Sequence, residues 1–230
     1  MELTFKHKGK LGDILFSLCF IKNVGGGKLY LEIGDFLDQT GYEFLRPLLI
    51  SQPYITDVEI WRGEQVNYDL DIFRNIMNSS HTRTTCESFF VVFGVPTPVD
   101  FDTEPWLEVT DELFVGGVLI NRVERGLHGR ESKTNMYKEL TKDKINMCYF
   151  VGLPHEYEEF KNSCEVDIPY QPAKDALELA QMIKGSQLCL MNHSMPLVIA
   201  EGLKKTIILE TRLDVGKTDC MFNRPNLHYI

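Results

Sequence analysis

Short apolar runs alternate with stretches of helical periodicity along almost the whole sequence, and this alternation limits the folds that the chain can adopt. Runs typical of β-strands occupy residues 3–7, 28–33, 57–61, 114–120, 147–151, 187–191 and 206–210, and residues 166–168 are a candidate for one more. Helical spacing predicts helices at residues 13–23, 42–51, 69–77, 84–93, 136–141, 157–162, 172–184 and 194–203. This order of strands and helices is typical of an α/β fold with parallel sheets, followed here by a tail at 211–230.

One segment interrupts the alternation. Residues 95–112 contain three prolines and many acidic residues, and we interpret them as a linker. The linker divides the chain into residues 1–112 and 113–230, each of which begins with a strand and a polar loop. Both parts are long enough to fold as small domains.

Composition excludes several classes of protein. Hydrophobic residues make up 43% and charged residues 25% of the chain, as in ordinary globular proteins. No apolar run approaches the roughly 18 residues of a membrane span, and the start lacks the pattern of a secretion signal. The six cysteines form no CxxC pair, so we expect no zinc cage and reduced thiols in a cytoplasmic protein.

Charge is distributed unevenly between the two parts. Residues 1–112 hold nine Lys and Arg against 18 Asp and Glu, whereas residues 113–230 hold 15 of each kind. The acidic first part argues against broad contact with nucleic acid, which needs local positive charge. A small basic cluster in the second part suits one phosphorylated ligand, and it consists of Arg122, Arg125, Arg130 and Lys133.

The first candidate motif follows the first predicted strand and covers residues 7–17. Its glycines, Gly9 and Gly12, allow a ligand to approach the backbone closely at a helix N-terminus. Asp13 is expected at the carboxyl end of the strand, where a carboxylate can take a proton from a substrate hydroxyl. On spacing alone, the simpler interpretation is that Asp13 only caps the helix.

The second motif follows a buried strand and covers residues 119–125. Arg122 and Arg125 are expected to hold a diphosphate through bidentate hydrogen bonds, beside Asn121. The alternative is a solvated loop in which arginine pairs with Glu124.

The third motif, residues 188–202, predicts a strand, a small polar turn and a helix. Ser194 and the nearby amides are candidates for binding phosphate, and Glu201 is a candidate for holding ribose hydroxyls. The alternative makes Ser194 a helix cap and Glu201 a surface charge. His193 alone is more often structural than catalytic.

Two of these motifs resemble one known family. Residues 12–18, Gly-Asp-Ile-Leu-Phe-Ser-Leu, resemble the N-terminal signature of glycosyltransferase family 9, the heptosyltransferase-like enzymes. Residues 185–203 resemble that family's C-terminal sugar-donor motif, which usually reads Asp-Thr-Gly-x-x-His. The motifs lie at the corresponding ends of the chain.

The resemblance implies a GT-B fold, with two Rossmann-like domains that face each other across a cleft. The first domain would bind the acceptor, with Lys10 and Gly12 beside the catalytic base Asp13. The second would bind a nucleotide sugar, with the phosphate at residues 192–194. The chain is shorter than a usual member, and the turn departs from the family pattern at Asn192, His193, Ser194 and Leu197. An ADP-heptose donor therefore does not carry over.

These observations lead to an expected mechanism. We expect an inverting glycosyltransferase that uses a nucleotide-diphosphate sugar and needs neither metal nor further cofactor. Asp13 would accept the proton of the acceptor hydroxyl, while Arg122, Arg125 and the amides at Ser194 stabilise the departing diphosphate. The two Asp-x-Asp sequences, at 69–71 and 100–102, are interpreted as surface features rather than metal ligands.

Two alternatives remain open. The short chain and the altered turn suit a non-catalytic protein that binds a nucleotide or a nucleotide sugar. A compact transferase of this type could also modify a hydroxylated base in phage DNA, with modest support from Lys6, Lys8 and Lys10. Because the first part is acidic, a saccharide or small-molecule acceptor ranks above DNA.

Overall fold

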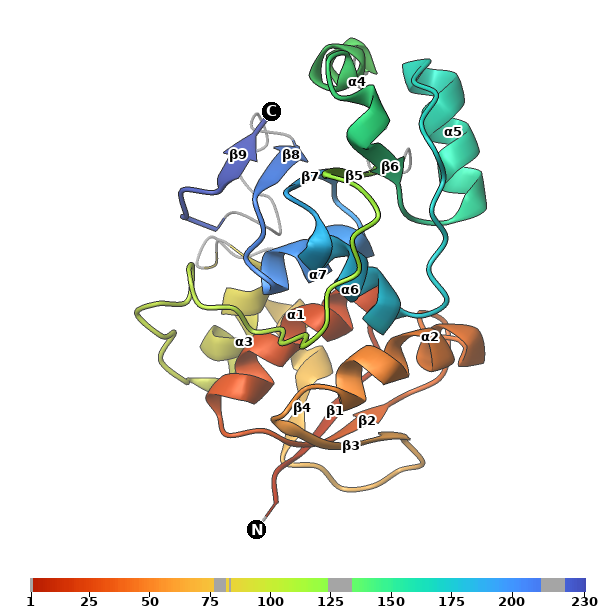
Figure 1. Cartoon of the computed structure of the whole chain (residues 1–230). Coiled ribbons are helices and arrows are strands. Elements are labelled where there is room, and N and C mark those ends of the chain that lie inside the picture. The colour runs from red at the N-terminus through yellow and green to blue at the C-terminus, as the bar shows by residue number, and fades with distance from the viewer. Residues whose placement is uncertain (1, 77–81, 83, 124–133, 212–221) are drawn as a thin grey trace. The chain divides into compact units, whose positions relative to one another are not determined.

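The chain folds into two compact units, each built on its own parallel sheet (Figure 1). The computed structural model describes residues 2–76, 82, 84–123, 134–211 and 222–230. Unit 1 contains Met1–Val109, together with residues 175–177 and 222–224. Unit 2 contains Thr110–Lys174, Glu178–Thr211 and Pro225–Ile230.

Unit 1 has a four-stranded parallel sheet in the order β3-β2-β1-β4. Its strands are β1 (Thr4–His7), β2 (Gly27–Leu31), β3 (Ile55–Ile60) and β4 (Tyr68–Asp69). Its helices are α1 (Leu11–Asn23), α2 (Gln39–Ile50), the 3-10 helix η1 (Leu70–Asn75) and α3 (Thr85–Phe93). The strands after β1 lie first on one side of it and then, with β4, on the other. The order of the sheet therefore reverses between β1 and β4, and we call this position the switch point of unit 1.

Helix α1 forms the centre of the core of unit 1. Every residue from Ile14 to Ile21 is buried, because the helix is covered on more than one side. The segment that we interpreted as a linker supplies part of this cover. Trp106 and Phe101 are buried, and the Trp106 ring centroid lies 6.4 Å from that of Phe16. Most of residues 95–112 therefore belongs to unit 1, because its aromatic side chains complete the core.

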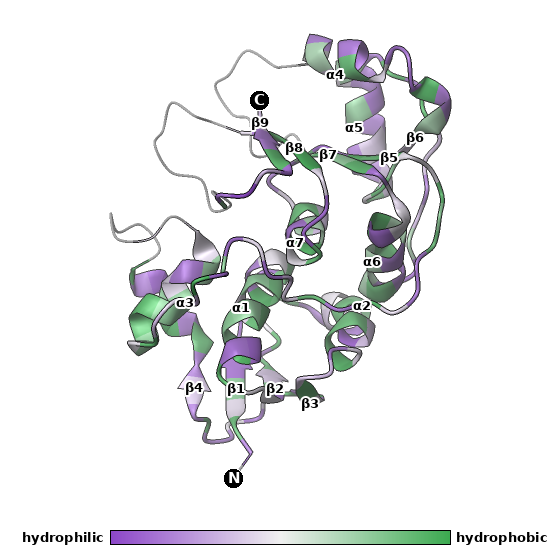
Figure 2. Cartoon of the chain, turned by 60° about the vertical axis from the view of Figure 1, so that its left-hand side comes forward, coloured by the Kyte–Doolittle hydropathy of each residue, from purple (hydrophilic) through white to green (hydrophobic). Residues whose placement is uncertain are grey.

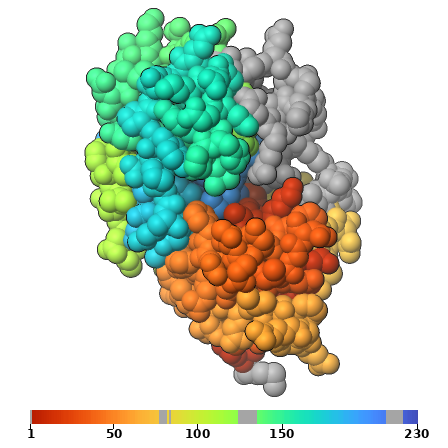
Figure 3. All heavy atoms as spheres, turned by 90° about the vertical axis from the view of Figure 1, so that its right-hand side faces the viewer, coloured from red at the N-terminus to blue at the C-terminus, as the bar shows by residue number. Residues whose placement is uncertain are grey.

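Helix α2 lies at the surface of unit 1. Leu45, Leu48 and Leu49 are buried, whereas Gln39 and Glu43 are exposed. The space-filling view shows the outer side of this helix in orange (Figure 3). The amphipathic pattern of the sequence thus places α2 as a covering layer on the sheet.

Unit 2 has a five-stranded parallel sheet in the order β6-β5-β7-β8-β9. Its strands are β5 (Val118–Asn121), β6 (Cys148–Phe150), β7 (Leu188–Asn192), β8 (Ile207–Glu210) and β9 (Leu227–Tyr229). Its helices are α4 (Thr134–Thr141), the 3-10 helix η3 (Ile145–Met147), α5 (Pro154–Cys164), α6 (Ala176–Gly185) and α7 (Met195–Gly202). The order reverses between β5 and β7, which is the switch point of unit 2. Helix α7 is hydrophobic along most of its length and is almost entirely buried (Figure 2).

Three expected elements differ from the structure. Residues 69–77 do not form an α-helix, because β4 and η1 occupy the segment up to Asn75. Residues 166–168 form no strand, although Tyr170 makes an isolated parallel bridge with Phe150. The expected tail contains β9, which pairs with β8 and completes the sheet. Each of these elements depends on tertiary pairing more than on local periodicity.

None of the helices within the described ranges has the length and apolar character needed to cross a membrane.

Candidate functional site

The switch point of unit 1 brings two loops together at the carboxyl edge of the sheet. In open α/β sheets, ligands bind at this position, where the loops of neighbouring strands diverge. The loop after β1 leads into α1, and Asp13 lies in the first turn of that helix. The segment after β4 is η1, which carries Arg74 in its last turn.

Asp13 and Arg74 are joined by an ion pair. Nη2 of Arg74 lies 3.1 Å from Oδ2 of Asp13, and both side chains are partly exposed, at 33% and 24%. Within the described part of the chain, Oδ1 of Asp13 accepts no hydrogen bond. Asp13 is not the helix cap, because Lys10 occupies the N-cap position of α1. The site thus presents one oriented carboxylate with an oxygen left for a substrate.

Gly9 permits this ion pair to form. A Cβ at Gly9 would lie 2.9 Å from Nη2 of Arg74 and 2.9 Å from Cβ of Asp13, and it would also clash with the His7 ring. These contacts are closer than real Cβ atoms tolerate. Glycine is therefore required here by the close approach of three side chains to the backbone.

His7 and Asp71 hold the loop between β1 and α1. Nδ1 of His7 accepts a hydrogen bond from the Gly9 amide at 2.8 Å, and Oδ1 of Asp71 accepts one from the Lys8 amide at 3.0 Å. Complete burial lowers the pKa of His7 to about 3, so the ring is neutral near pH 7. Because Nδ1 is an acceptor, we assign the proton to Nε2. Within the described residues, Nε2 has no hydrogen-bond partner.

Lys6 completes the support of this loop. Its Nζ lies 2.7 Å from Oε2 of Glu32 and 2.8 Å from Oδ2 of Asp71. Burial lowers the pKa of Lys6, but hydrogen bonds to Asp71 and Glu32 outweigh that effect and raise the pKa above its usual value. Asp71 is mostly buried, so the interpretation of Asp69 and Asp71 as surface features is wrong for Asp71. Its carboxylate binds Lys6 and the loop backbone.

The two residues expected near the acceptor lie beside Asp13 in sequence. Lys10 is exposed at the N-cap of α1, and Gly12 is the second residue of that helix.

Arg74 was not among the sequence candidates. Its signal is weak, because it is a single arginine in the segment Asp-Ile-Phe-Arg-Asn, and the ion pair spans 61 positions.

In unit 2, Asn192 ties together the two loops at the switch point. Its Oδ1 accepts a hydrogen bond from the Val123 amide at 3.0 Å, and its Nδ2 donates to the Val123 carbonyl at 2.8 Å. The pair fixes the chain just after β5 against the end of β7. The Asn192 amide is therefore occupied with backbone groups.

The turn before α7 leaves the start of this helix without a side-chain cap. Ser194 is the N-cap residue, but its hydroxyl donates to the Asn192 carbonyl at 3.1 Å instead of accepting from a helix amide. Nε2 of His193 lies 2.8 Å from Oγ1 of Thr211, beyond the end of β8. Uncapped amides at a helix N-terminus attract anions such as phosphate.

Asn121 presents a buried acceptor at the same edge. Its Nδ2 donates to the Val151 carbonyl at 2.7 Å, which fixes the orientation of the amide. Its Oδ1 is buried and has no hydrogen-bond partner in the part of the chain that the structure describes. A Cβ at Gly152 would lie 2.5 Å from this Nδ2, so the loop after β6 approaches Asn121 closely.

Arg122 follows β5 directly, and its side chain is turned into the protein interior. Its guanidinium is completely buried, and Nε lies 3.0 Å from Oε2 of Glu210. The Tyr137 hydroxyl donates to the same oxygen at 2.9 Å, and the guanidinium carbon lies 5.6 Å from the Tyr137 ring centroid. Burial, followed by the Glu210 charge, raises the pKa of Tyr137 well above its usual value. Arg122 is thus an internal partner of Glu210, so its side chain is not part of a solvated loop. Its expected contact with a diphosphate stays a prediction. Arg125 lies outside the described residues.

Glu201 is also an internal residue. It is buried in α7, and its Oε1 lies 2.9 Å from Nζ of Lys204. This ion pair corrects the interpretation of Glu201 as a surface charge. Its expected contact with ribose hydroxyls stays a prediction.

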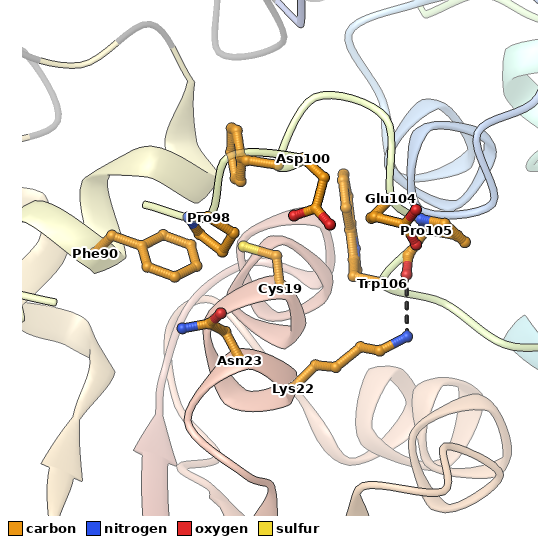
Figure 4. A pocket seen from close by; sticks show the side chains of 10 residues that line it. Cys19, Lys22, Asn23, Phe90, Pro98, Asp100, Glu104, Pro105 and Trp106 are labelled. Carbon is orange, nitrogen blue, oxygen red and sulfur yellow. Dashed lines mark hydrogen bonds between the residues drawn. The ribbon is translucent and has the colours of Figure 1, made fainter. Parts of the chain in front are cut away.

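A separate pocket of about 270 Å³ lies elsewhere in unit 1 (Figure 4). It is lined from α1, α3 and the following segment by Cys19, Lys22, Asn23, Phe90, Pro98, Asp100, Phe101, Glu104, Pro105 and Trp106. Cys19 lies six residues beyond Asp13 along α1, which corresponds to about 9 Å of helix rise. The pocket is therefore distinct from the Asp13 site.

Comparison with known proteins shows what this fold resembles. No family model matches the sequence, and no curated protein matches it. The structure matches the glycosyl transferase family 9 protein from Veillonella parvula DSM 2008 with a TM-score of 0.61 and 10% identity, over 90% of this chain and 79% of that one. It matches E. coli heptosyltransferase WaaC with ADP-2-deoxy-2-fluoro heptose with a TM-score of 0.59 and 11% identity, over 100% of this chain and 93% of that one.

A third structure gives the same result. The match to E. coli ADP-heptose lps heptosyltransferase II has a TM-score of 0.57 and 12% identity, over 100% of this chain and 90% of that one. The chain is thus an α/β protein with two parallel sheets. Its fold is the GT-B fold of these family 9 glycosyltransferases, which confirms the expected fold class.

Proposed function

We propose that this protein is a glycosyltransferase that moves a sugar from a nucleotide-diphosphate sugar to an acceptor hydroxyl. The observation that carries the proposal is the Asp13 carboxylate at the switch point of unit 1, with one oxygen held by Arg74. The GT-B fold of the family 9 structures supports it, because sugar transfer is the activity named for those proteins.

The proposed reaction is a single displacement. The acceptor oxygen forms a bond to the anomeric carbon while the bond between that carbon and the diphosphate breaks, which inverts the configuration. Asp13 takes the proton of the attacking hydroxyl as general base. Arg74 orients the carboxylate through the ion pair at 3.1 Å. Lys10 and Gly12, which are close to Asp13 in sequence, would lie beside the acceptor.

The sugar donor is assigned to unit 2. The uncapped amides of α7, with Ser194 and His193, would hold the diphosphate and stabilise its growing charge. The buried Oδ1 of Asn121 would accept a hydrogen bond from a hydroxyl or amino group of the sugar donor. Two neighbours were solved with ADP or an ADP-sugar analogue, so an adenine nucleotide is the first donor to test.

We further propose that the reaction needs no metal ion. The helix amides supply the electrostatic stabilisation that a metal would otherwise give to the leaving group. Among the described residues, no three His, Cys, Asp or Glu side chains are grouped to hold an ion. The direct check is transfer activity in the presence of excess EDTA.

The test is a screen of ADP-, UDP- and GDP-sugars against saccharide and small-molecule acceptors. Release of nucleotide diphosphate together with a glycosylated product is the expected result, and proton NMR of the product should show inversion at the anomeric carbon. Tight nucleotide binding by calorimetry without turnover of any donor would instead favour the non-catalytic binding protein.

A further inference from the structure

An aromatic side chain is exposed beside the Asp13 site. Phe36 lies in the loop between β2 and α2, at the carboxyl edge of the sheet, and it is 51% exposed. The loop itself is anchored, because the Gly34 amide donates to the Leu37 carbonyl at 2.8 Å and Leu37 is buried. The anchored backbone therefore holds a large apolar side chain in contact with solvent.

Phe36 connects to the proposed base through Arg74. The guanidinium carbon of Arg74 lies 5.6 Å from the Phe36 ring centroid and 4.8 Å from that of Phe73. The same guanidinium makes the ion pair with Asp13. Segments that follow β1, β2 and β4 thus place a carboxylate, a cation and an exposed aromatic ring next to one another.

We propose that Phe36 is the platform on which the ring of a saccharide acceptor lies, with one of its hydroxyls directed to Asp13. This inference rests on the proposed transferase function and names its acceptor class. A sugar ring has an apolar C–H face and a polar rim. The exposed part of the Phe36 ring suits the apolar C–H face of the sugar. Oδ1 of Asp13 suits a hydroxyl on the polar rim.

The charges at the site favour a neutral ligand over a polyanion. Asp13 compensates the charge of Arg74, the residue in contact with the ring. Residues 1–112 carry twice as many acidic as basic side chains, which disfavours the phosphates of nucleic acid. The competing occupant is a hydroxylated DNA base, which these charges disfavour and which the experiment has to exclude.

The experiment measures binding and transfer separately. Methyl α- and β-pyranosides of glucose, galactose and mannose are the probes, and saturation-transfer NMR reports their binding to the intact chain. The variants are Phe36→Ala and Phe36→Trp. The matched control is Phe114→Ala, because Phe114 is an exposed phenylalanine of unit 2. Unchanged thermal midpoints establish that each variant folds.

At least one pyranoside should bind the wild type, and Phe36→Ala should weaken that binding about 10-fold, the loss expected when roughly a quarter of a phenylalanine surface, about 55 Å², is no longer covered. Phe36→Trp should keep most of the affinity, and Phe114→Ala should leave it unchanged. In transfer assays, Phe36→Ala should raise the acceptor KM and leave the KM of the sugar donor unchanged.

Equal pyranoside binding by Phe36→Ala and wild type overturns the inference. The absence of pyranoside binding also overturns it. A third contradicting result is that only the binding of an oligonucleotide containing 5-hydroxymethylcytosine depends on Phe36. Pyranoside binding that depends on Phe36 without transfer from any donor would keep this inference and remove the proposed enzyme activity.

Discussion

Nη2 of Arg74 lies 3.1 Å from Oδ2 of Asp13, and this ion pair links the segments that follow β4 and β1 at the switch point of unit 1. The backbone of each residue is fixed by a helix: Asp13 lies in the first turn of α1, and Arg74 lies in the last turn of η1. The pair therefore fixes the direction of the carboxylate without occupying both of its oxygens.

Replacing Arg74 tests this orienting role. Arg74→Met should lower kcat about 10- to 100-fold, because a carboxylate that is free to rotate spends less time in the reactive geometry. Arg74→Lys should recover part of the rate, since it restores a cation without the fixed planar fork. The KM of the sugar donor should not change in either variant. The control is Arg62→Met, which removes an exposed arginine of the same unit. Equal kcat values for Arg74→Met and wild type would contradict the role.

Gly9 should not tolerate a side chain. Gly9→Ala places a methyl group against His7, Arg74 and Asp13, so we expect the free energy of unfolding to fall by about 1–3 kcal/mol. Transfer activity should fall further than the loss of folded protein explains, because the Asp13 ion pair is displaced. Urea denaturation and initial rates measure the two effects. Gly34→Ala is the control, since its Cβ meets no atom within 4 Å. Equal effects of the two substitutions would contradict the account.

The buried His7 predicts a specific dependence of stability on pH. Its pKa is about 3 in the folded chain and about 6.5 when unfolded, so below pH 6.5 the unfolded state binds a proton that the folded state does not. Stability should therefore fall as the pH decreases from 6.5 towards 3, by at most about 5 kcal/mol from this residue. Urea denaturation of His7→Gln should show a shallower decline than wild type over this range. Parallel curves would show that His7 is protonated in the folded protein.

The buried pair of Arg122 and Glu210 predicts a structural effect. Arg122→Met leaves the Glu210 carboxylate buried with only the Tyr137 hydroxyl among the contacts described above, and we expect a loss of about 3–5 kcal/mol in the free energy of unfolding. Adding Glu210→Gln should restore part of that loss, because no unpaired charge remains. If Arg122→Met is instead as stable as wild type and loses affinity for nucleotide diphosphates, the original assignment to the sugar donor holds.

The strand and helix pattern of the sequence predicted most of both sheets, because buried strands such as β5 and β7 are apolar up to a final asparagine. It failed for η1 and β9, which are short and form through contacts with distant segments. Local periodicity contains little information about such elements.

The candidate site divides in the same way. The position of Asp13 followed from its place after the first strand, although its catalytic role stays a prediction. Arg74 and Phe36 could not be found, because their contacts depend on how three loops converge. The burial of Arg122 against Glu210 was not predicted either. An arginine that follows a buried strand looks the same in sequence whether it faces solvent or a glutamate 88 positions away.

The most direct test of the central claim is sugar transfer by Asp13→Asn, measured in single-turnover assays with calorimetry of nucleotide diphosphate binding on the same protein. Asparagine keeps the shape of the side chain and removes its capacity to accept a proton near pH 7. The account predicts a loss of transfer of about 100-fold or more, with the dissociation constant of the nucleotide within about twofold of wild type. Transfer at the wild-type rate would contradict it.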